Sequence, residues 1–322
     1  MALAALLILA ACAINPTPEP TARATPIANP SLVVTKASHP AALPGVTPTT
    51  AATPSSTPVH TPTRHPTIAA HPRIVVLAEN LAGLDDLALG PDGSIFVSNV
   101  NDGTVKAYTP DGRLTPVVSG ISEPEGMVVL PDGSLIIAEQ GKNRLVRYDL
   151  ATKKLTSFLD LDNKTSHPGV DGIALDARNR DDMTIIIPDS PNGAVLRAGL
   201  DGKIRGVIGR GFARPTGAWV EQDGSVLVVD EAGSTLKRIR PDGTLEVLAK
   251  LPVPDDVIAD EAGNIFVNTL GDNAIHLIPA GSTQDAILVG GLSGPQAIIL
   301  DAVGNLVVTD TGHSRLIKIV IR

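Results

Sequence analysis

The chain has 322 residues, a formal net charge of -8 and a single cysteine. An acidic chain without a run of basic residues lacks the cations that neutralise phosphates, so nucleic acid is excluded as the expected partner. One cysteine, Cys12, also excludes an internal disulfide.

The N-terminus is an apolar segment, Met1 to Ile14, that contains this cysteine. It is shorter than the roughly 20 residues of a membrane-spanning helix and is typical of a signal peptide. The string Leu9-Ala10-Ala11-Cys12 resembles the bacterial lipobox, in which cleavage precedes a cysteine that carries lipid. The resemblance implies a signal peptide at residues 1–11, lipidation of Cys12 and a location at the extracytoplasmic face of the cell membrane, with the lipid as the membrane contact. The alternative is an apolar N-terminus with an incidental cysteine.

The next segment is rich in proline, threonine, alanine and serine. Thirteen of the 27 prolines fall between Ala13 and Pro72. Such a composition buries too little apolar surface to offset its ordering entropy and favours extended polyproline conformations. We therefore expect residues 12–72 to form a disordered stalk behind the lipidated cysteine, with recognition of the prolines by an SH3-type partner as the alternative.

A unit of about 40 residues then recurs six times up to Arg322, which is the spacing of propeller blades. Each unit has a short apolar run, a turn and a second apolar run rich in Val and Ile, and these runs predict strands. Glycine turns mark five of the units: Gly93-Ser94, Gly133-Ser134, Gly224-Ser225, Gly263-Asn264 and Gly304-Asn305, while Asp182-Met183 replaces the turn in the third.

The units predict an all-β domain at residues 73–322, a six-bladed β-propeller of four-stranded blades. Four strands can be drawn in each of the first five units; in the second they are Gly126 to Leu130, Ser134 to Ala138, Arg144 to Asp149 and Lys154 to Leu159. The sixth unit has three strands. Because an open sheet edge is a site of aggregation, we expect the apolar run Arg73 to Ala78 to complete the last blade and close the ring.

The sixth unit, Gly294 to Asp310 followed by Arg315 to Lys318, resembles an NHL repeat. The units are also similar to those of the SMP-30/gluconolactonase/LRE superfamily, whose six-bladed propellers include calcium-dependent lactonases. The resemblance covers about residues 73 to 322. It implies the fold, whereas the function has to be argued from the site.

Residues that directly precede the innermost strands are expected to surround one mouth of the central channel. Alignment on the turns gives Asp85, Glu125, Asp171, Thr216, Asp255 and Gln296, which we call the acid ring. Converging carboxylates stay ionised together only around a cation; otherwise some of them bind protons at raised pKa values. The donor atoms of these side chains are oxygens, which favour calcium over zinc. The candidate metal ligands are Asp85, Glu125, Asp171 and Asp255. Thr216 and Gln296 are candidate substrate contacts.

The lactonase resemblance bears on the same positions. It implies metal ligands at blade mouths, often an acid followed by glycine, as in Glu125-Gly126 and Asp171-Gly172. Asp256 stands where the family usually has glycine, and the family's asparagine ligands are absent from the ring.

Other polar residues on this face offer further roles. His167 and His313 are candidate general bases. Arg214, with Arg144 and Arg315, supplies a rival explanation, because guanidinium groups can neutralise the acids or bind an anionic substrate. A second set of polar residues closes the second strands, and we expect these side chains to form Asx-type turns: Asn99, Glu139, Asp189, Asp230, Asn268 and Asp310.

Two functions remain open from the sequence. The first is a lipid-anchored, calcium-dependent hydrolase of lactones or esters that binds a small molecule at the channel mouth. The second is a non-catalytic, NHL-like propeller whose loop face binds a protein or glycan.

Overall fold

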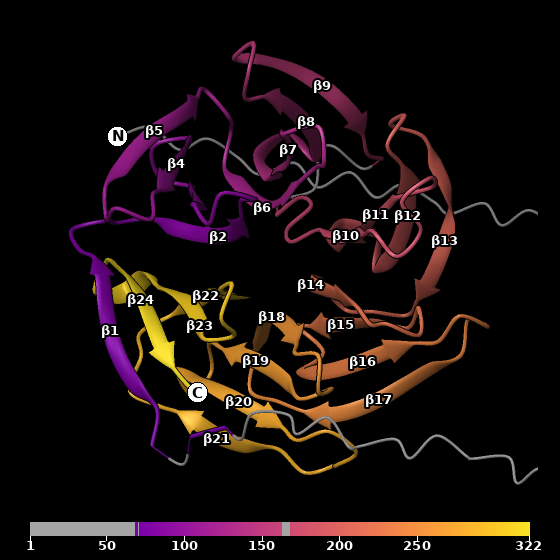
Figure 1. Ribbon diagram of the computed structural model, residues 1–322. Helices are drawn as coiled ribbons and strands as arrows, with labels where there is room; N and C mark the ends of the chain where they lie inside the picture. The colour runs from indigo at the N-terminus through magenta and orange to yellow at the C-terminus, as the bar shows by residue number, and fades with distance from the viewer. Residues whose placement is uncertain (1–67, 70, 163–167) are drawn as a thin grey trace, which may run out of the picture. The chain divides into compact units, whose positions relative to one another are not determined.

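The computed structural model describes residues 68–69, 71–162 and 168–322. Cys12, the proline-rich segment and His167 lie outside these residues. The described residues form six antiparallel four-stranded sheets arranged around a central axis as a β-propeller (Figure 1). Among them, no helix has both the length and the apolar character needed to cross a bilayer.

The blades follow one another along the chain. Blade 1 contains β2 (Leu84–Leu89), β3 (Ile95–Asn99), β4 (Thr104–Tyr108) and β5 (Leu114–Ser119). Blade 2 contains β6 (Pro124–Val129), β7 (Ser134–Glu139), β8 (Arg144–Asp149) and β9 (Lys154–Asp160). Blade 3 contains β10 (Ala174–Asp176), β11 (Thr184–Asp189), β12 (Ala194–Gly199) and β13 (Ile204–Arg210).

Blade 4 contains β14 (Pro215–Val220), β15 (Val226–Asp230), β16 (Thr235–Ile239) and β17 (Leu245–Lys250). Blade 5 contains β18 (Pro254–Ala259), β19 (Ile265–Thr269), β20 (Ala274–Ile278) and β21 (Ala286–Val289). Blade 6 contains β22 (Pro295–Leu300), β23 (Leu306–Asp310), β24 (Arg315–Val320) and β1 (Arg73–Ala78). Short 3-10 turns follow the second strands of blades 2, 3 and 6: η1 (Gln140–Lys142), η2 (Ser190–Asn192) and η3 (Thr311–His313).

The ring closes as the sequence predicts. β1 pairs antiparallel with β24, with Arg73 opposite Val320 and Val76 opposite Ile317. Figure 1 shows this indigo strand beside the yellow end of the chain. Just before β1, the backbone N–H of Ala69 donates to the carbonyl of Ile321 at 2.8 Å. The N-terminal strand therefore covers an edge that β24 would otherwise expose.

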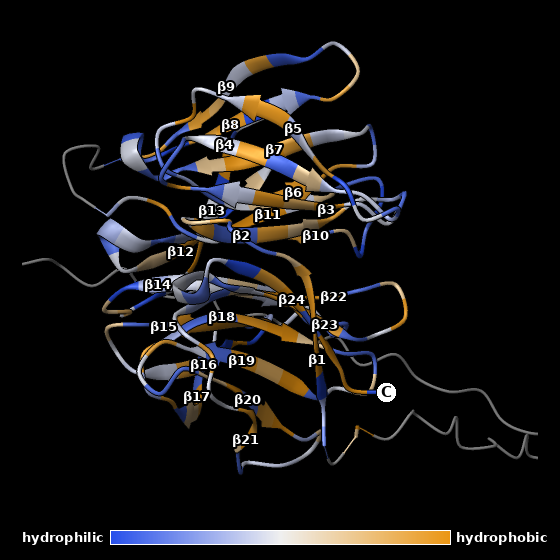
Figure 2. Ribbon diagram, turned by 90° about the vertical axis from the view of Figure 1, so that its left-hand side faces the viewer, coloured by the Kyte–Doolittle hydropathy of each residue, from blue (hydrophilic) through white to orange (hydrophobic). Residues whose placement is uncertain are grey.

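The predicted glycine turns join the first and second strands of the blades. Gly93 and Gly304, for example, both have a φ of 83°, a left-handed conformation that glycine adopts without a Cβ clash. The hydrophobic residues concentrate in the strands that these turns connect, and the hydrophilic ones in the loops (Figure 2). The turn signal therefore located the blades correctly.

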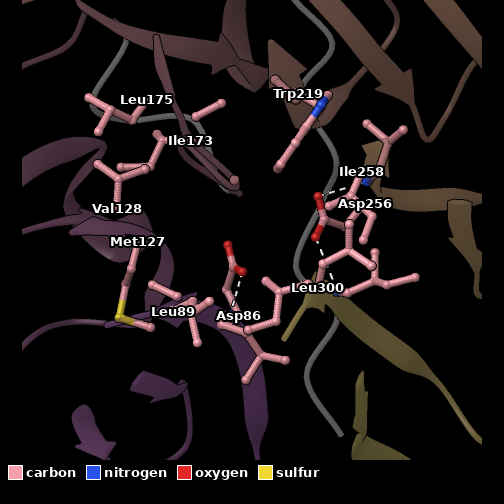
Figure 3. Close-up of a pocket in the computed structure, with 18 of the residues that line it drawn as sticks. Asp86, Leu89, Met127, Val128, Ile173, Leu175, Trp219, Asp256, Ile258 and Leu300 are labelled. Atoms are coloured by element: carbon pink, nitrogen blue, oxygen red, sulfur yellow. Dashed lines mark hydrogen bonds between the residues drawn. The ribbon is translucent and has the colours of Figure 1, made fainter. Parts of the chain in front are cut away.

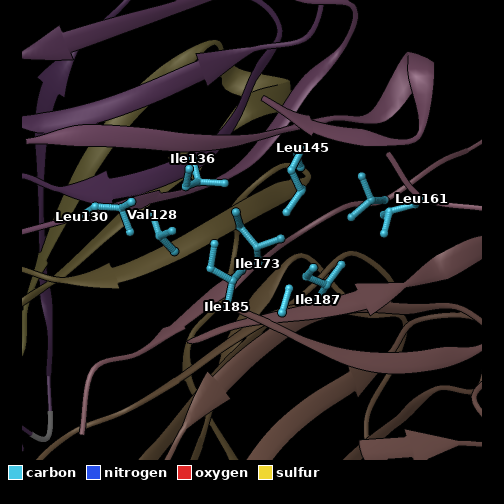
Figure 4. Packing of buried hydrophobic residues seen from close by; sticks show 11 residues of the cluster. Val128, Leu130, Ile136, Leu145, Leu161, Ile173, Ile185 and Ile187 are labelled. Carbon is cyan, nitrogen blue, oxygen red and sulfur yellow. The ribbon is translucent and has the colours of Figure 1, made fainter. Parts of the chain in front are cut away.

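The hydrophobic core lies between neighbouring blades. In the described part of the chain, one cluster of buried residues fills each interface between adjacent sheets. Between blades 2 and 3, Ile136 and Leu145 face Ile185 and Ile187 (Figure 4). Strands such as β7 are buried along both faces, which explains their continuous apolar runs. This packing fixes the six innermost strands around the channel.

Candidate functional site: the acidic mouth of the central channel

A β-bulge positions the ring residues at the start of the innermost strands. In β2, Leu84 pairs with Asn99, but the next paired residue is Leu87, opposite Val97. The extra residue bends the strand and turns the side chains of Asp85 and Asp86 away from regular alternation. Similar irregularities occur at the same point of β6, β14, β18 and β22.

The ring residues converge, as the sequence predicts. The carboxyl groups of Asp85 and Glu125 are hydrogen-bonded to each other. The side-chain amide of Gln296 donates to Asp85 across 3.5 Å. Asp255 lies close enough to Asp85 and Asp171 for electrostatic repulsion to raise its pKa. Asp85, Glu125 and Asp255 are all buried.

Burial is the largest influence on the ionisation of these acids. It raises the pKa of Asp85, and together with repulsion by Asp85 and Asp171 it raises the pKa of Glu125 well above its ordinary value. Burial followed by repulsion from Asp171 and Asp85 raises the pKa of Asp255 in the same way. Without a cation, the ring therefore retains protons under conditions in which exposed carboxyl groups are ionised.

Asp171 differs because an arginine binds it. Nη2 of Arg214 donates to Oδ2 of Asp171 at 2.6 Å, and Nε2 of Gln140 lies 3.4 Å from the same oxygen. Burial raises the pKa of Asp171 to about 6, and Arg214 opposes this rise. Arg214 also forms an ion pair with Glu231. Neutralisation by arginine therefore applies to Asp171.

The other two arginines have different partners. Arg144 pairs with Glu139, and Arg315 pairs with Asp310 at 2.7 Å, so both bind acids at the ends of second strands. Neither arginine is paired with an acid of the ring in these contacts, so the predicted neutralisation of the ring by Arg144 and Arg315 is not seen. The interpretation of the ring as a purely arginine-paired cluster loses support accordingly.

Thr216 has a structural bond. Its hydroxyl donates to the backbone carbonyl of Asp255 at 2.7 Å, and the residue is fully buried. This bond connects blade 4 to blade 5 at the ring, so the neutral side chains that contact the ring acids are Gln296, beside Asp85, and Gln140, beside Asp171. Among the described residues, no group of three or more His, Cys, Asp or Glu side chains has the placement of a metal site.

The second polar set is mainly a set of loop anchors. Asn99 accepts hydrogen bonds from the backbone of Asn101 and Asp102, as expected of an Asx turn. Other members accept instead from the loop that leads into the innermost strand of their own blade: Glu139 from Ser122, Asp230 from Ala213 and Arg214, and Asp310 from Ser293. The Asx interpretation is therefore wrong for these three, because their partners lie 16 or 17 residues upstream.

One member of this set was misaligned. Pro254 of blade 5 pairs with Thr269, as Pro295 of blade 6 pairs with Asp310, so Thr269 closes β19. Asn268 lies one residue earlier, where its side chain accepts from the N–H of Asp256 and donates to the carbonyl of Pro295. The position of a turn in the sequence does not show the register of the paired strands, so the prediction at Asn268 is one residue early.

His313 lies on η3, and Nδ1 is 2.9 Å from Oδ2 of Asp310. Its side chain is about half exposed, with 47% of its surface accessible. η3 is tied to the ring, since the hydroxyl of Thr311 donates to the carbonyl of Leu84 at 2.8 Å. His313 therefore stands on the ring face, held by Asp310.

Two further carboxyl groups, which the sequence analysis did not assign to the site, lie one residue beyond the ring. Asp86 and Asp256 point into the channel in Figure 3. Burial raises the pKa of Asp256 to about 7, and burial and repulsion by Asp256 raise that of Asp86 well above its ordinary value. A signal was available in the sequence, because Asp85-Asp86 and Asp255-Asp256 are charged doublets inside otherwise apolar strands.

The fold and site together define a six-bladed β-propeller with an acidic channel mouth. No protein-family model and no curated protein sequence matches the chain. Solved structures do. A gluconolactonase from Xanthomonas campestris has 15% sequence identity and a TM-score of 0.65, over 78% of this chain and 90% of that one. A calcium-binding regucalcin from Agrobacterium tumefaciens has 16% identity and a TM-score of 0.65, over 79% and 94%.

A third similar structure has a different activity. Virginiamycin B lyase from Staphylococcus aureus has 14% identity and a TM-score of 0.60, over 78% of this chain and 99% of that one. At these identities the likeness shows the fold, which is the fold of gluconolactonase-like and regucalcin-like propellers. The activity has to be argued from this chain's own residues.

Proposed function

We propose that the propeller is a calcium-dependent hydrolase of lactones or esters, with the acid ring as its active site. The observation that carries this proposal is the convergence of Asp85, Glu125 and Asp255 in a buried channel mouth, where each carboxyl group has a raised pKa. Arg214 is already bound to Asp171 and Glu231. A divalent cation would replace the protons that the three acids otherwise retain.

The donor set suits calcium by its chemistry. Carboxylate oxygens are hard ligands, and calcium accepts six to eight oxygens in flexible geometry, including those of water. Asp85, Glu125 and Asp255 would hold the ion, and the amide of Gln296 would stand beside it. The gluconolactonase and the calcium-binding regucalcin with the same fold support this choice.

The residues of the chain would divide the remaining work. Bound calcium supplies Lewis-acid polarisation of a carbonyl and lowers the pKa of a bound water. With the protons displaced by the cation, Asp85 or Glu125 would accept the proton of an attacking water. Arg214 holds Asp171 in place at the rim and can orient the substrate, and His313 and His167 are the alternative bases.

Thermal unfolding and activity together test this proposal. Millimolar calcium should raise the melting temperature relative to excess chelator, because binding at a hundredfold excess over the dissociation constant stabilises the folded state by roughly 3 kcal/mol. Purified protein should hydrolyse a simple lactone or aryl ester with calcium and not with chelator. Asp132→Asn, which removes an exposed acid paired with Arg147, is the matched control and should keep both effects. A melting temperature indifferent to calcium, with no hydrolysis, would overturn the proposal.

A second function is favoured by the Arg214–Asp171 pair. The guanidinium group of Arg214 neutralises the charge of Asp171 in the ring. Such a pair is compatible with a surface that binds a ligand without catalysing a reaction. In that case the propeller binds a protein or glycan through its loop face. The same experiment separates the two, because the scaffold would show neither calcium stabilisation nor hydrolysis.

We also propose that Cys12 anchors the chain by lipid at the extracytoplasmic face of the cell membrane. The support is the lipobox-like string alone. Cys12→Ser should release the protein from the membrane fraction or block its processing. An unmodified Cys12 in the mass spectrum of the wild-type protein would contradict the anchor.

A further inference from the structure

A cavity occupies the channel on the side of Asp86 and Asp256 that faces away from the acid ring. Its volume is about 340 Å³, and all six innermost strands contribute to its wall. It extends from these two acids to the last residues of the strands, such as Leu89 and Leu300, where the turns to the second strands begin. This volume is in the range of small-molecule sites, about 300 to 1,000 Å³.

The wall is apolar except at its inner end. Leu89, Ile173, Ile258 and Leu300 line it, together with Trp219 (Figure 3). An apolar wall favours a hydrocarbon body, since burial of apolar surface contributes about 25 cal/mol per Å². The polar end decides which hydrocarbon-bearing molecule fits.

The two carboxyl groups at the inner end are fixed in position. Oδ1 of Asp256 accepts from the N–H of Val257 at 2.8 Å, and Oδ2 accepts from the N–H of Ile298 at 3.2 Å. Oδ1 of Asp86 accepts from the N–H of Leu87. Oδ2 of Asp86 has no hydrogen-bond partner among the described residues. The inner end therefore presents preorganised acceptors with one oxygen available to a ligand.

Neighbouring innermost strands approach closely just beyond the acid ring. Gly126, Gly172 and Gly217 occupy the position that follows the ring residue in blades 2, 3 and 4. A Cβ atom at Gly126 would lie 2.6 Å from Cα of Gly172, and one at Gly217 would lie 2.5 Å from Oδ1 of Asp256. Such contacts require glycine, so the strands approach closely here. Asp86 and Asp256 line the cavity, whereas the proposed calcium ligands Asp85, Glu125 and Asp255 are not among its lining residues.

We propose that the cavity binds a hydrophobic monoamine, with its ammonium group between Asp86 and Asp256 and its hydrocarbon body against the apolar wall. The two acids complement a cation with N–H donors, and charge-assisted hydrogen bonds are the stronger kind. An anion would be repelled, and a neutral hydrocarbon would leave the carboxyl groups without a ligand partner.

The sole tryptophan of the chain makes this proposal testable, because Trp219 lies in the cavity wall. Its fluorescence should respond saturably to cyclohexylmethylamine, measured on the whole chain in excess chelator so that calcium plays no part. The neutral isostere cyclohexylmethanol should bind at least tenfold more weakly, since a hydrogen bond to a charged group is worth about 1.5 to 3 kcal/mol.

The variants remove charge and retain shape. Asp86→Asn with Asp256→Asn should abolish the preference for the amine over the alcohol, because asparagine cannot carry the negative charge. Its single oxygen can accept from the N–H of Leu87 at position 86, whereas at position 256 it can accept only one of the two backbone hydrogen bonds that Asp256 accepts. Asp111→Asn with Asp132→Asn removes two carboxyl groups at exposed sites and should preserve the preference. Circular dichroism checks folding, and the single variant Asp86→Asn replaces the double one if the latter does not fold.

The outcomes are distinct. A saturable amine response that the variants at Asp86 and Asp256 weaken supports the proposal. No saturation with the amine, equal affinity for amine and alcohol, or a preference that survives the loss of both carboxylates would overturn it. None of these results depends on whether the acid ring binds calcium or hydrolyses a lactone, so the two proposals stand or fail separately.

Discussion

Raising the pH from 5 to 8 in the presence of chelator should destabilise the protein, and the direction follows from the buried channel acids. Burial raises the pKa of Asp171 from 3.8 to about 6 and that of Asp256 from 3.8 to about 7. The folded state therefore binds protons more tightly than the unfolded chain. The stabilisation is complete below about pH 4 and is lost as the pH rises through 6 and 7.

The magnitude can be worked from the same values. Each pKa unit corresponds to about 1.4 kcal/mol. Between pH 5 and 8, Asp171 loses roughly one unit and Asp256 roughly two, so the free energy of unfolding should fall by about 4 kcal/mol. Acids with lowered pKa values do not contribute between pH 5 and 8. Burial alone would raise the pKa of Asp176, but hydrogen bonds from Arg178 and Arg197 lower it to about 2. Asp176 therefore affects the free energy of unfolding only below about pH 4.

Urea unfolding followed by the fluorescence of Trp219 measures this change. The variant with Asp171→Asn and Asp256→Asn should show a much smaller difference between pH 5 and 8, and calcium should restore stability at pH 8 if the ring binds it. Equal or greater stability at pH 8 than at pH 5 in chelator would refute the reasoning that these acids are buried and protonated.

Three further predictions concern single contacts. Glu125→Gln should abolish the stabilisation by calcium while raising the melting temperature in chelator, because glutamine is neutral without having to bind the proton that Glu125 retains. A fall in both conditions would instead indicate a structural ion pair. Deleting Arg73 to Ala78 should lower the free energy of unfolding in urea by roughly 5 kcal/mol, because five backbone positions of β24 lose their partners at about 1 kcal/mol each. Deleting residues 13–67 should change the urea midpoint little. Arg214→Ala should cost about 3 kcal/mol at pH 8 and less at pH 5, where Asp171 holds a proton, while the exposed Arg113→Ala serves as the neutral control.

The sequence predicted the blades because the local chemistry that makes them is visible in it. A glycine turn such as Gly93-Ser94 has one preferred backbone conformation, and the apolar runs beside it have strand length. The closure by β1 followed from counting strands, since a missing outer strand in the last blade requires a partner. The ring positions of Asp85, Glu125, Asp171 and Asp255 followed from the same alignment.

Finer features of the site depended on information that the sequence does not display. The bulge in β2 and β18 brings Asp86 and Asp256 into the channel, and a bulge is a property of strand pairing. The predicted closing residue of β19, Asn268, lies one position before the actual one, Thr269, for the same reason. The partners of Glu139 and Asp310 lie 17 residues upstream in another loop, which residue spacing within one turn cannot indicate.

The pairing of β1 with β24 also determines when the ring can form during synthesis. β1 leaves the ribosome before the other strands of the propeller, but the strand it binds, β24, is the last of them to be translated. Blades 1 to 5 are available long before that, and until then the apolar face of blade 1 at Leu84 and Leu87 lacks the blade 6 residues Val307 and Leu316. The nascent chain therefore carries an uncovered hydrophobic face throughout its elongation. Such an exposed apolar face favours aggregation until blade 6 is complete.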